Sequence, residues 1–498
     1  MRHKVLLAVA LAALMATPAF AAVQNVKVSG AIDSTYISRQ HFNLGSKVLT
    51  QGGGENGLRN QNAFITQTTV RIDADLSDNV STTVGLINER GWGAEHSTIT
   101  STSTGGITTT TTNNNANDTN VQLYLAYATM REFLYSPLTV SVGRQYFGYG
   151  NNLIIGTDGV NNVATGNLAA IANDMTLRST YDGVKAILDY KPLTIDLLYF
   201  KNNTGTDAGL TGANNANKRQ SDVYGLNANY QLGDAMNSVV EGYFFARVGG
   251  HYNTTVVTDK GDTLYVPGLR VSTNPIKGLN TQAEIAWQRG TKSLAPGSAT
   301  VGGDNLPREA MAAQLTASYT LPVLEQYKPV VNASYTFVSG DKNGDDQRQT
   351  PASSNTGSRS VYTAWDPFNE AQGSGTIYNT LFNLTNLNIF ALGVQATPIQ
   401  DVTATATWSG LWLNKKVGTG NLIGNSMPTL QADGTATPTF ATTGKKDLGN
   451  EYDVNVNYAY TEDVTFGLSL GWFVPGKTFN SANDSVASQA LAHVNVNF

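Results

Sequence analysis

The residues whose types and spacing suggest chemistry are charged groups on both sides of a long polar connection, 147–180. Arg144 comes just before it, Arg178 lies near its end, and Asp182 and Lys185 follow it. Opposed charges across a narrow aqueous passage create a transverse field that selects solutes by charge and dipole. We therefore predict that 147–180 folds into a water-filled lumen and forms a constriction with these four side chains.

Arg144 raises a question of side-chain direction. It shares the alternation of Leu138, Val140 and Val142, so a regular strand would point it at lipid. A charge there costs about 2–4 kcal/mol at the membrane midplane. Gly143 allows a β-bulge that would reverse the register and turn Arg144 inward, which is our prediction. The alternative is that Arg144 stays on the outer face and extends its side chain to the lipid headgroups.

Further charged residues alternate with apolar ones, as expected for a β-sheet with one face toward water and the other toward lipid. With Asp182 and Lys185 counted among them, acids outnumber bases by eight to three. Such a lumen of mixed sign suits small neutral or zwitterionic solutes better than a polyanion. The other members of this set are Arg71, Asp73, Asp75, Asp189, Asp196, Glu241, Arg247, Glu284 and Asp453.

One segment has the ligand spacing of a calcium loop. Asp341, Asn343 and Asp345 offer oxygen atoms at every second position. The segment lacks glycine at the sixth position and has Ala352 where an EF-hand has glutamate, so it is not that motif. It predicts either a calcium site in an outer loop or a solvated acidic turn, and no other cofactor is predicted.

Catalysis has no support in the local sequence. The chain has no cysteine, which excludes a thiolate nucleophile, a disulfide and a cysteine-based zinc site. None of its five histidines has an acid at the spacing of a metal site or a catalytic triad. We predict that the protein is not an enzyme, since an enzymatic site would have to be assembled from distant strands.

The composition also argues against an ordinary soluble enzyme. Only 14% of the 498 residues are charged and 41% are hydrophobic, whereas globular domains average about 25% and 45–50%. The net charge of -5 and the absence of a basic run argue against nucleic acid as a partner.

The first residues have the pattern of a secretory signal peptide. Arg2 and Lys4 precede an apolar run, and the small-x-small triplet 19–21 follows it. We predict cleavage after residue 21, which leaves 22–498 as one exported domain. The alternative of a membrane anchor needs a longer apolar run, and no later stretch is long enough for a transmembrane helix. A closed barrel is the remaining way to span a membrane.

The rest of the chain alternates between apolar and polar residues over segments of about ten residues. Short connections alternate with long ones, a pattern typical of outer-membrane barrels with short periplasmic turns and long extracellular loops. We predict an all-β, transmembrane, antiparallel β-barrel of about 18 strands; the alternative is a large soluble β-sandwich or solenoid. The predicted strands are 23–39, 61–76, 79–92, 119–131, 137–146, 181–190, 193–203, 220–231, 237–248, 263–272, 279–290, 308–320, 328–339, 384–396, 401–413, 447–460, 463–474 and 488–498.

Several short motifs occur in order along the chain: 138–145, 148–150, 178–184, 339–343, 365–368, 448–453, 471–476 and the terminal Phe498. Together they resemble the alginate-export family of outer-membrane porins. The resemblance implies an eighteen-stranded barrel and an inward arginine at the position of Arg144. The name-giving member of the family passes an anionic polysaccharide through an electropositive pore, and the acidic bias of the wall predicted here departs from that pore.

These observations predict a porin of the bacterial outer membrane that lets small hydrophilic solutes diffuse passively through a water-filled lumen. Two alternatives stay open: a solute-specific channel of the alginate-export type for an anionic saccharide, and a structural or scaffold barrel. The predicted partners are outer-membrane lipid and lipopolysaccharide, the solutes themselves, and further copies of the chain in a homo-oligomer.

Overall fold

The computed structural model describes residues 25–45, 60–92, 97–102, 108–113, 121–156, 175, 177, 180–203, 220–249, 262–292, 306–341, 361–372, 375–419, 422–423 and 440–498. Nearly all of them belong to one antiparallel sheet. The predicted signal peptide lies outside the described residues. Among the described residues, no helix has the length and apolar character needed to cross a lipid bilayer.

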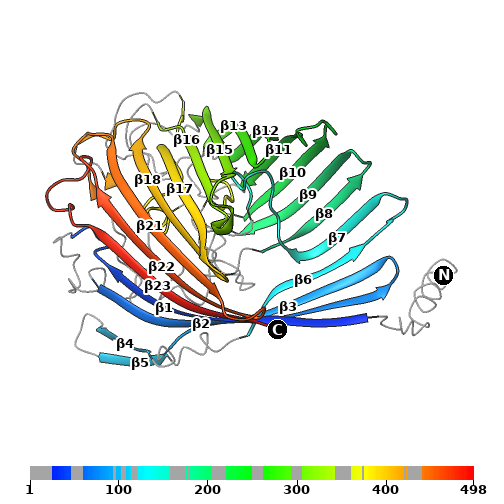
Figure 1. The fold of residues 1–498 in the computed structure, drawn as a ribbon, viewed down its shortest axis with the longest axis horizontal. Helices are drawn as coiled ribbons and strands as arrows, with labels where there is room; N and C mark the ends of the chain where they lie inside the picture. Colours follow the sequence, from blue (N-terminus) through cyan, green and yellow to red (C-terminus); the bar gives the residue numbers. More distant parts are fainter. Residues whose placement is uncertain are drawn as a thin grey trace, which may run out of the picture.

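Within the described ranges, the sheet has nineteen strands; β14 has only two residues, and the other eighteen strands are long. Figure 1 shows these long strands following one another along the chain as a single curved wall. The predicted fold is confirmed. The long strands are β1 (Asn25–Gln40), β2 (Asn60–Ser77), β3 (Val80–Gly91), β6 (Gln122–Met130), β7 (Leu138–Gln145), β8 (Tyr181–Asp189), β9 (Leu193–Asn203), β10 (Gln220–Gln231), β11 (Val239–Gly249), β12 (Thr263–Ile276), β13 (Leu279–Lys292), β15 (Ala310–Thr320), β16 (Val330–Val338), β17 (Leu387–Ile399), β18 (Val402–Leu413), β21 (Asp447–Ala459), β22 (Val464–Pro475) and β23 (Ala487–Asn497).

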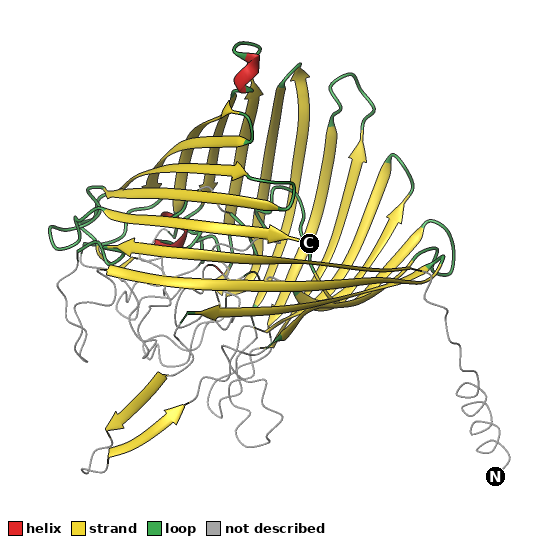
Figure 2. Cartoon of the chain, turned by 60° about the horizontal axis from the view of Figure 1, so that its bottom comes forward, coloured by secondary structure: helices red, strands yellow, loops and turns green. Residues whose placement is uncertain are grey.

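Short elements accompany this wall. The hairpin of β4 and β5 projects beyond the barrel (Figure 2), and the other short elements lie in the connections between long strands. Their bounds are β4 (Ser97–Thr102), β5 (Thr108–Asn113), β14 (Leu306–Pro307), η4 (Glu325–Tyr327), α2 (Tyr378–Leu381), β19 (Leu422–Ile423) and β20 (Phe440–Ala441).

The first and last strands close the wall into a barrel. β1 pairs with β2 on one side and with β23 on the other, from Ala31 opposite Asn497 to Gln40 opposite Ser488. Gly30 exchanges two backbone hydrogen bonds with Phe498, and a Cβ atom at Gly30 would lie 2.5 Å from the Phe498 ring. Closure pairs the edge N–H and C=O groups, which lipid could not satisfy.

Successive side chains along each strand point to opposite faces of the barrel. On β11, Phe244 is 45% exposed, whereas its neighbours Tyr243 and Phe245 are buried. The same alternation puts Tyr224 outside and Val223 inside on β10. The exposed face carries apolar and aromatic side chains around the barrel, as the predicted lipid-facing surface requires.

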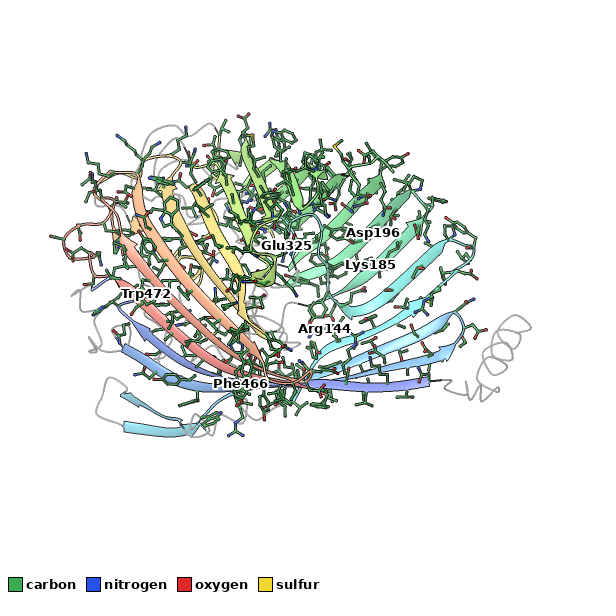
Figure 3. The ribbon with its side chains drawn as sticks, in the orientation of Figure 1. Arg144, Lys185, Asp196, Glu325, Phe466 and Trp472 are labelled. Atoms are coloured by element: carbon green, nitrogen blue, oxygen red, sulfur yellow. The ribbon has the colours of Figure 1, made fainter. Side chains whose placement is uncertain are left out.

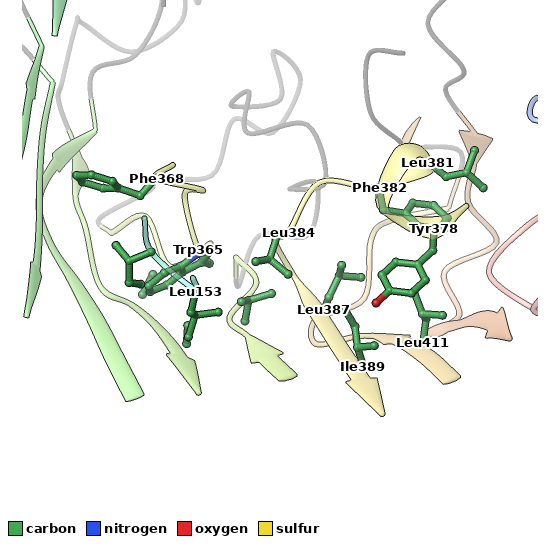
Figure 4. Packing of buried hydrophobic residues seen from close by; sticks show 14 of the residues in the cluster. Leu153, Trp365, Phe368, Tyr378, Leu381, Phe382, Leu384, Leu387, Ile389 and Leu411 are labelled. Atoms are coloured by element: carbon green, nitrogen blue, oxygen red, sulfur yellow. The ribbon is translucent and has the colours of Figure 1, made fainter. Parts of the chain in front are cut away.

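The interior is filled at the long-connection end by two stretches of chain, called here the inward segments: the first is 147–156, and the second is described over 361–372 and 375–386. Their apolar side chains form one buried cluster with the inner wall; Figure 4 shows Leu153 and Trp365 packed together and Leu384 near Leu387. The two segments also pair with each other, since Ala371 N donates to Asn152 O and Gly156 N donates to Asn369 O, both at 2.9 Å. This core narrows the lumen.

Candidate functional site: the lumen wall and its inward segments

Carboxylates on the inner wall hold the first inward segment by its backbone. Glu241 on β11 accepts a hydrogen bond from Gly150 N at 3.2 Å, and Glu284 on β13 accepts one from Asn151 N at 2.9 Å. The Tyr243 hydroxyl donates to the other oxygen of Glu284 at 2.7 Å. Because Gly150 has φ +60 and a Cβ there would lie 2.9 Å from both Glu284 oxygens, this close approach strongly favours glycine.

Arg270 on β12 completes this anchor. Its guanidinium donates to Asn151 Oδ1 at 2.7 Å, to Glu241 Oε2 at 3.1 Å and to Gln282 Oε1 at 2.8 Å. The sequence analysis did not identify Arg270. Its alternation with Leu269 and Val271 was the available signal, because those two side chains have the parity of the outer face.

A carboxylate of the second inward segment is bound by three cations of the wall. Asp366 forms ion pairs with Arg247 at 3.2 Å, Lys292 at 2.9 Å and Arg308 at 2.5 Å. Gln288 on β13 exchanges two hydrogen bonds with the Asp366 backbone. Burial alone would raise the pKa of the Asp366 carboxyl, but the charges of Lys292, Arg308 and Arg247 hold it well below its usual range. Asp366 is therefore ionised and clamped.

The same segment is held on the opposite wall by two acids of β21. Glu451 accepts hydrogen bonds from Ile377 N at 2.8 Å and Tyr378 N at 2.6 Å. Asp453 accepts one from the Thr376 hydroxyl at 2.7 Å. Wall acids thus serve chiefly as acceptors for inward backbone, so their number does not measure the charge that a solute meets.

Glu89 on β3 holds a third stretch in the same way. It accepts hydrogen bonds from Leu177 N at 2.8 Å and from the Gln67 amide at 2.7 Å. The same amide also donates to Met175 O at 2.9 Å. The described residues at both ends of the predicted constriction segment 147–180 therefore contact the inner wall, while 157–174 lie outside the described residues.

Beside the first inward segment is a polar cavity of about 670 Å³. Lys185, Asp196, Glu241 and Arg270 bring two charges of each sign to it. Burial raises the pKa of the Tyr149 phenol, which therefore stays protonated and can donate a hydrogen bond. The remaining lining residues are Tyr146, Gly148, Tyr149, Gly150, Asn152, Thr194, Asn227 and Asn229.

Three polar atoms around this cavity are buried without a hydrogen-bond partner among the described residues. They are Asp196 Oδ1, Asn227 Oδ1 and the Tyr149 hydroxyl oxygen. Buried polar groups in folded proteins are almost always satisfied by protein, water or ligand. The cavity is therefore suited to polar occupants.

The structure places most of the predicted lumen residues on the inner face, including Asp196, Glu284 and Asp453 as described above. Lys185 lines the cavity, Glu241 and Arg247 hold the inward segments, and Arg71 pairs with Asp73 at 2.8 Å on β2. Arg178 lies outside the described residues.

Arg144 and Asp182 lie on the outer face, so the prediction that both line the constriction is wrong. Arg144 is opposite Asp182 in the register, with Val142 and Val184 exposed on the same face. No register shift occurs between β6 and β7 at Gly143. The physical reason is that Asp182 compensates the charge of Arg144 at 2.6 Å, so no bulge is needed.

This pair belongs to a row of alternating charges across four strands, called here the outer ladder: Arg144, Asp182, Lys201 and Asp222. Asp182 is opposite Lys201 in the register, and Lys201 pairs with Asp222 at 2.5 Å. All four lie near the long-connection ends of β7 to β10. Figure 3 labels Arg144 on β7, next to Lys185 and Asp196 on the following strands.

The predicted calcium ligands are described only in part. Asp341 is buried, and Asn343 and Asp345 lie outside the described residues. Within the described ranges, no group of three or more metal-ligating side chains comes together.

The family model for alginate export matches residues 54–493. The protein belongs to the alginate export family. A comparison of this family member with curated protein sequences found no match.

Solved structures share the fold of this alginate export family protein. Acinetobacter baumannii OccAB1 is 12% identical with a TM-score of 0.51, and the match covers 96% of this chain and 97% of that one. Pseudomonas aeruginosa OpdK, an outer membrane protein, is 9% identical with a TM-score of 0.52 and coverages of 96% and 99%. The structure of OpdK with vanillate is 10% identical with a TM-score of 0.51, and the match covers 96% of this chain and 99% of that one. The predicted family and the predicted barrel are both confirmed.

Proposed function

We propose that this barrel is a porin of the bacterial outer membrane through which small hydrophilic solutes diffuse passively, without catalysis or an obligatory cofactor. The observation that carries the proposal is a closed barrel with an apolar outer face and a polar cavity of about 670 Å³ beside inward segments. Eighteen strands give a lumen wide enough for water.

The inward segments are proposed to set the size limit of the pore. Ion pairs and hydrogen bonds fix them to the wall at Glu241, Glu284, Asp366 and Glu451. A constriction held at several points has a defined width, so it excludes solutes by size as well as by charge.

A solute-specific channel for an anionic saccharide is the second candidate. The wall acids Glu241, Glu284 and Glu451 bind backbone N–H groups, which leaves Lys185 as an open cation in the cavity. The match to the alginate export family and the vanillate complex of OpdK, a carboxylate ligand, agree with this candidate.

The outer ladder supports the proposed membrane setting. Its charges lie at the long-connection end of the strands, where the headgroups of the outer leaflet, lipopolysaccharide included, would meet them. Midplane burial would cost far more than this interfacial position. A homo-oligomer is compatible with this arrangement and is tested by the mass of the detergent-solubilised protein.

Planar-bilayer recording and liposome swelling test the proposal. A porin gives ion conductance and a smooth fall in swelling rate with the size of neutral sugars. A specific channel admits glucuronate faster than glucose, which is similar in size. A scaffold barrel does not conduct, and that result would overturn the proposed function.

A further inference from the structure

We infer that Lys185 and Asp196 form a binding subsite for a small zwitterionic solute, one that carries both an ammonium and a carboxylate group. The subsite lies in the polar cavity beside the first inward segment. The inference rests on the proposed pore, because a solute reaches this cavity only through an open lumen.

The register places the two charges side by side on one face. Lys185 on β8 is opposite Leu198 of β9, and Asp196 stands two residues before Leu198 on that strand. Residues in this diagonal relation have Cα atoms roughly 7–8 Å apart, within the reach of a small solute that bridges them. Figure 3 shows them on neighbouring strands, and both line the cavity.

Both charges are open toward the cavity. Within the part of the chain that the structure describes, Lys185 Nζ forms no hydrogen bond or ion pair, and the centroid of the Phe147 ring lies 6.0 Å from it. Asp196 Oδ1 has no hydrogen-bond partner among the same residues. Glu241 and Arg270, the other two charges of the cavity, pair with each other and hold the inward segment.

Neutral neighbours extend each half of the subsite. Asn227 of β10 is opposite Asp196, and its Oδ1 is an unpartnered acceptor, so an ammonium group meets two acceptors there. Phe147 supplies an apolar surface beside Lys185 for the carbon chain of the solute. The carboxylate of the solute then faces Lys185 Nζ, and the Tyr149 hydroxyl lies beside the Asp196 carboxyl at the other end of the subsite.

This arrangement discriminates by charge pattern. A zwitterion compensates the charges of both Lys185 and Asp196. An anion compensates only Lys185 and leaves Asp196 without a partner, and a cation compensates only Asp196 and leaves Lys185 without one. A hydrogen bond to a charged group contributes about tenfold or more in affinity. We therefore expect at least tenfold weaker binding when either charge of the solute is removed.

The test measures the block of single-channel ion current by three molecules of matched size. These probes are 4-aminobutyrate, valerate, in which a methyl group replaces the ammonium, and 4-methylpentylammonium, in which an isopropyl group replaces the carboxylate. We expect saturable block by 4-aminobutyrate at a concentration about tenfold lower than for the other two. Equal block by all three would overturn the inference.

Two lumen variants assign the effect to the named residues. Asp196→Asn should remove the preference for 4-aminobutyrate over valerate, and Lys185→Met should remove its preference over 4-methylpentylammonium. The matched control is Lys201→Gln with Asp222→Asn, an ion pair on the outer face of the same strands, and it should keep both preferences. Preferences that survive in both lumen variants would overturn the inference.

Failure of the pore and failure of the subsite give different results. If the wild-type barrel does not conduct, the proposed function is wrong. If it conducts but shows no preference for the zwitterion, only the subsite is wrong. Conductance of each lumen variant shows that the barrel has folded.

Discussion

Strands β7 to β10 carry polar side chains on both faces, and the two faces treat charge differently. On the outside, Arg144 pairs with Asp182 and Lys201 pairs with Asp222, so each charge is compensated by its neighbour in the sheet. On the inside, Lys185 and Asp196 line a cavity without forming such a pair among the described residues. The same strands thus present a neutralised surface to lipid and open charges to the lumen.

A second contrast lies in what the charges hold. The Asp366 side chain is only 3% exposed and binds three cations of the inner wall, whereas the Asp222 side chain is 32% exposed and binds one. Buried ion pairs are costly to break because the remaining partner is left as a buried charge without water or a counter-charge. Exposed pairs contribute little because water replaces the lost partner. Inner charges therefore hold the inward segments in place, whereas outer charges compensate one another on the surface that faces the membrane.

The largest effect is expected for Asp366→Asn. It leaves Arg247, Lys292 and Arg308 without their shared anion and should lower the free energy of unfolding by about 3–5 kcal/mol. The released segment 361–386 should also widen the pore. Denaturant unfolding in lipid vesicles and single-channel conductance measure the two effects. Asp222→Asn is the outer control, and an equal loss in both variants would erase the contrast.

Acid should reproduce the loss of the Asp366 clamp only at low pH. The pKa of Asp366 is lower in the folded barrel than its ordinary value of 3.8, so its stabilisation is complete above that value. The stabilisation disappears as the pH falls through the lower, folded-state pKa. The clamp should therefore stay intact between pH 7 and about 4, and we expect the conductance of the barrel to be constant over this range. An opening in that range that Asp366→Asn abolishes would contradict this assignment.

Glu284→Leu should have the next largest effect. It removes the acceptor of Asn151 N and of the Tyr243 hydroxyl, and each buried donor left unpaired costs about 1–3 kcal/mol. Conductance should rise as 147–156 loosens. Glu284→Gln keeps an acceptor oxygen and should show a smaller change; an equal change in the two variants would show that the charge, and not the acceptor oxygen, holds the segment.

Ion selectivity separates the two faces directly. Lys185→Met should shift permeability toward cations by about threefold, since a unit charge about 6 Å from an ion in water contributes ~0.7 kcal/mol. Arg144→Met, which removes a cation from the outer ladder, should leave the reversal potential in a salt gradient unchanged. A shift with Arg144→Met would mean that this side chain reaches the lumen.

The smallest effect is expected for Lys201→Gln combined with Asp222→Asn. An exposed pair contributes roughly 0–1 kcal/mol, so the unfolding free energy should change by about 0.5 kcal/mol or less. Unfolding in vesicles measures it. A loss of several kcal/mol would show that the ladder is integral to the barrel rather than an adjustment of its surface.

The fold was predictable from the sequence because alternation and connection length act locally. The predicted strand 193–203 coincides with β9, and 181–190 differs from β8 by one residue. Turn-forming residues next to the strand ends indicate these boundaries in the sequence.

The site was less predictable because its partners lie far apart in the chain. Asp182 and Lys185 are three positions apart and so must face opposite sides of a regular strand, which the predicted constriction overlooked. Nothing local indicates that Asp182 pairs with Arg144, 38 positions away, or that Glu284 binds the backbone of Asn151, 133 positions away. Arg270 differs, because its alternation with Leu269 and Val271 marks it as a residue of the inner face, and only its partners are distant in the chain.

The pairing of β1 with β23 has a consequence for how the cylinder forms. Arg39 of β1 donates a hydrogen bond to Gln489 of β23, 450 positions later, so the second edge of β1 is covered only when β23 pairs with it. Contacts between such distant residues form slowly because so much intervening chain must be ordered first. Until Phe498 forms its hydrogen bonds with Gly30, the sheet has two edges with unpaired N–H and C=O groups. Such edges can pair with strands of other polypeptides and promote aggregation.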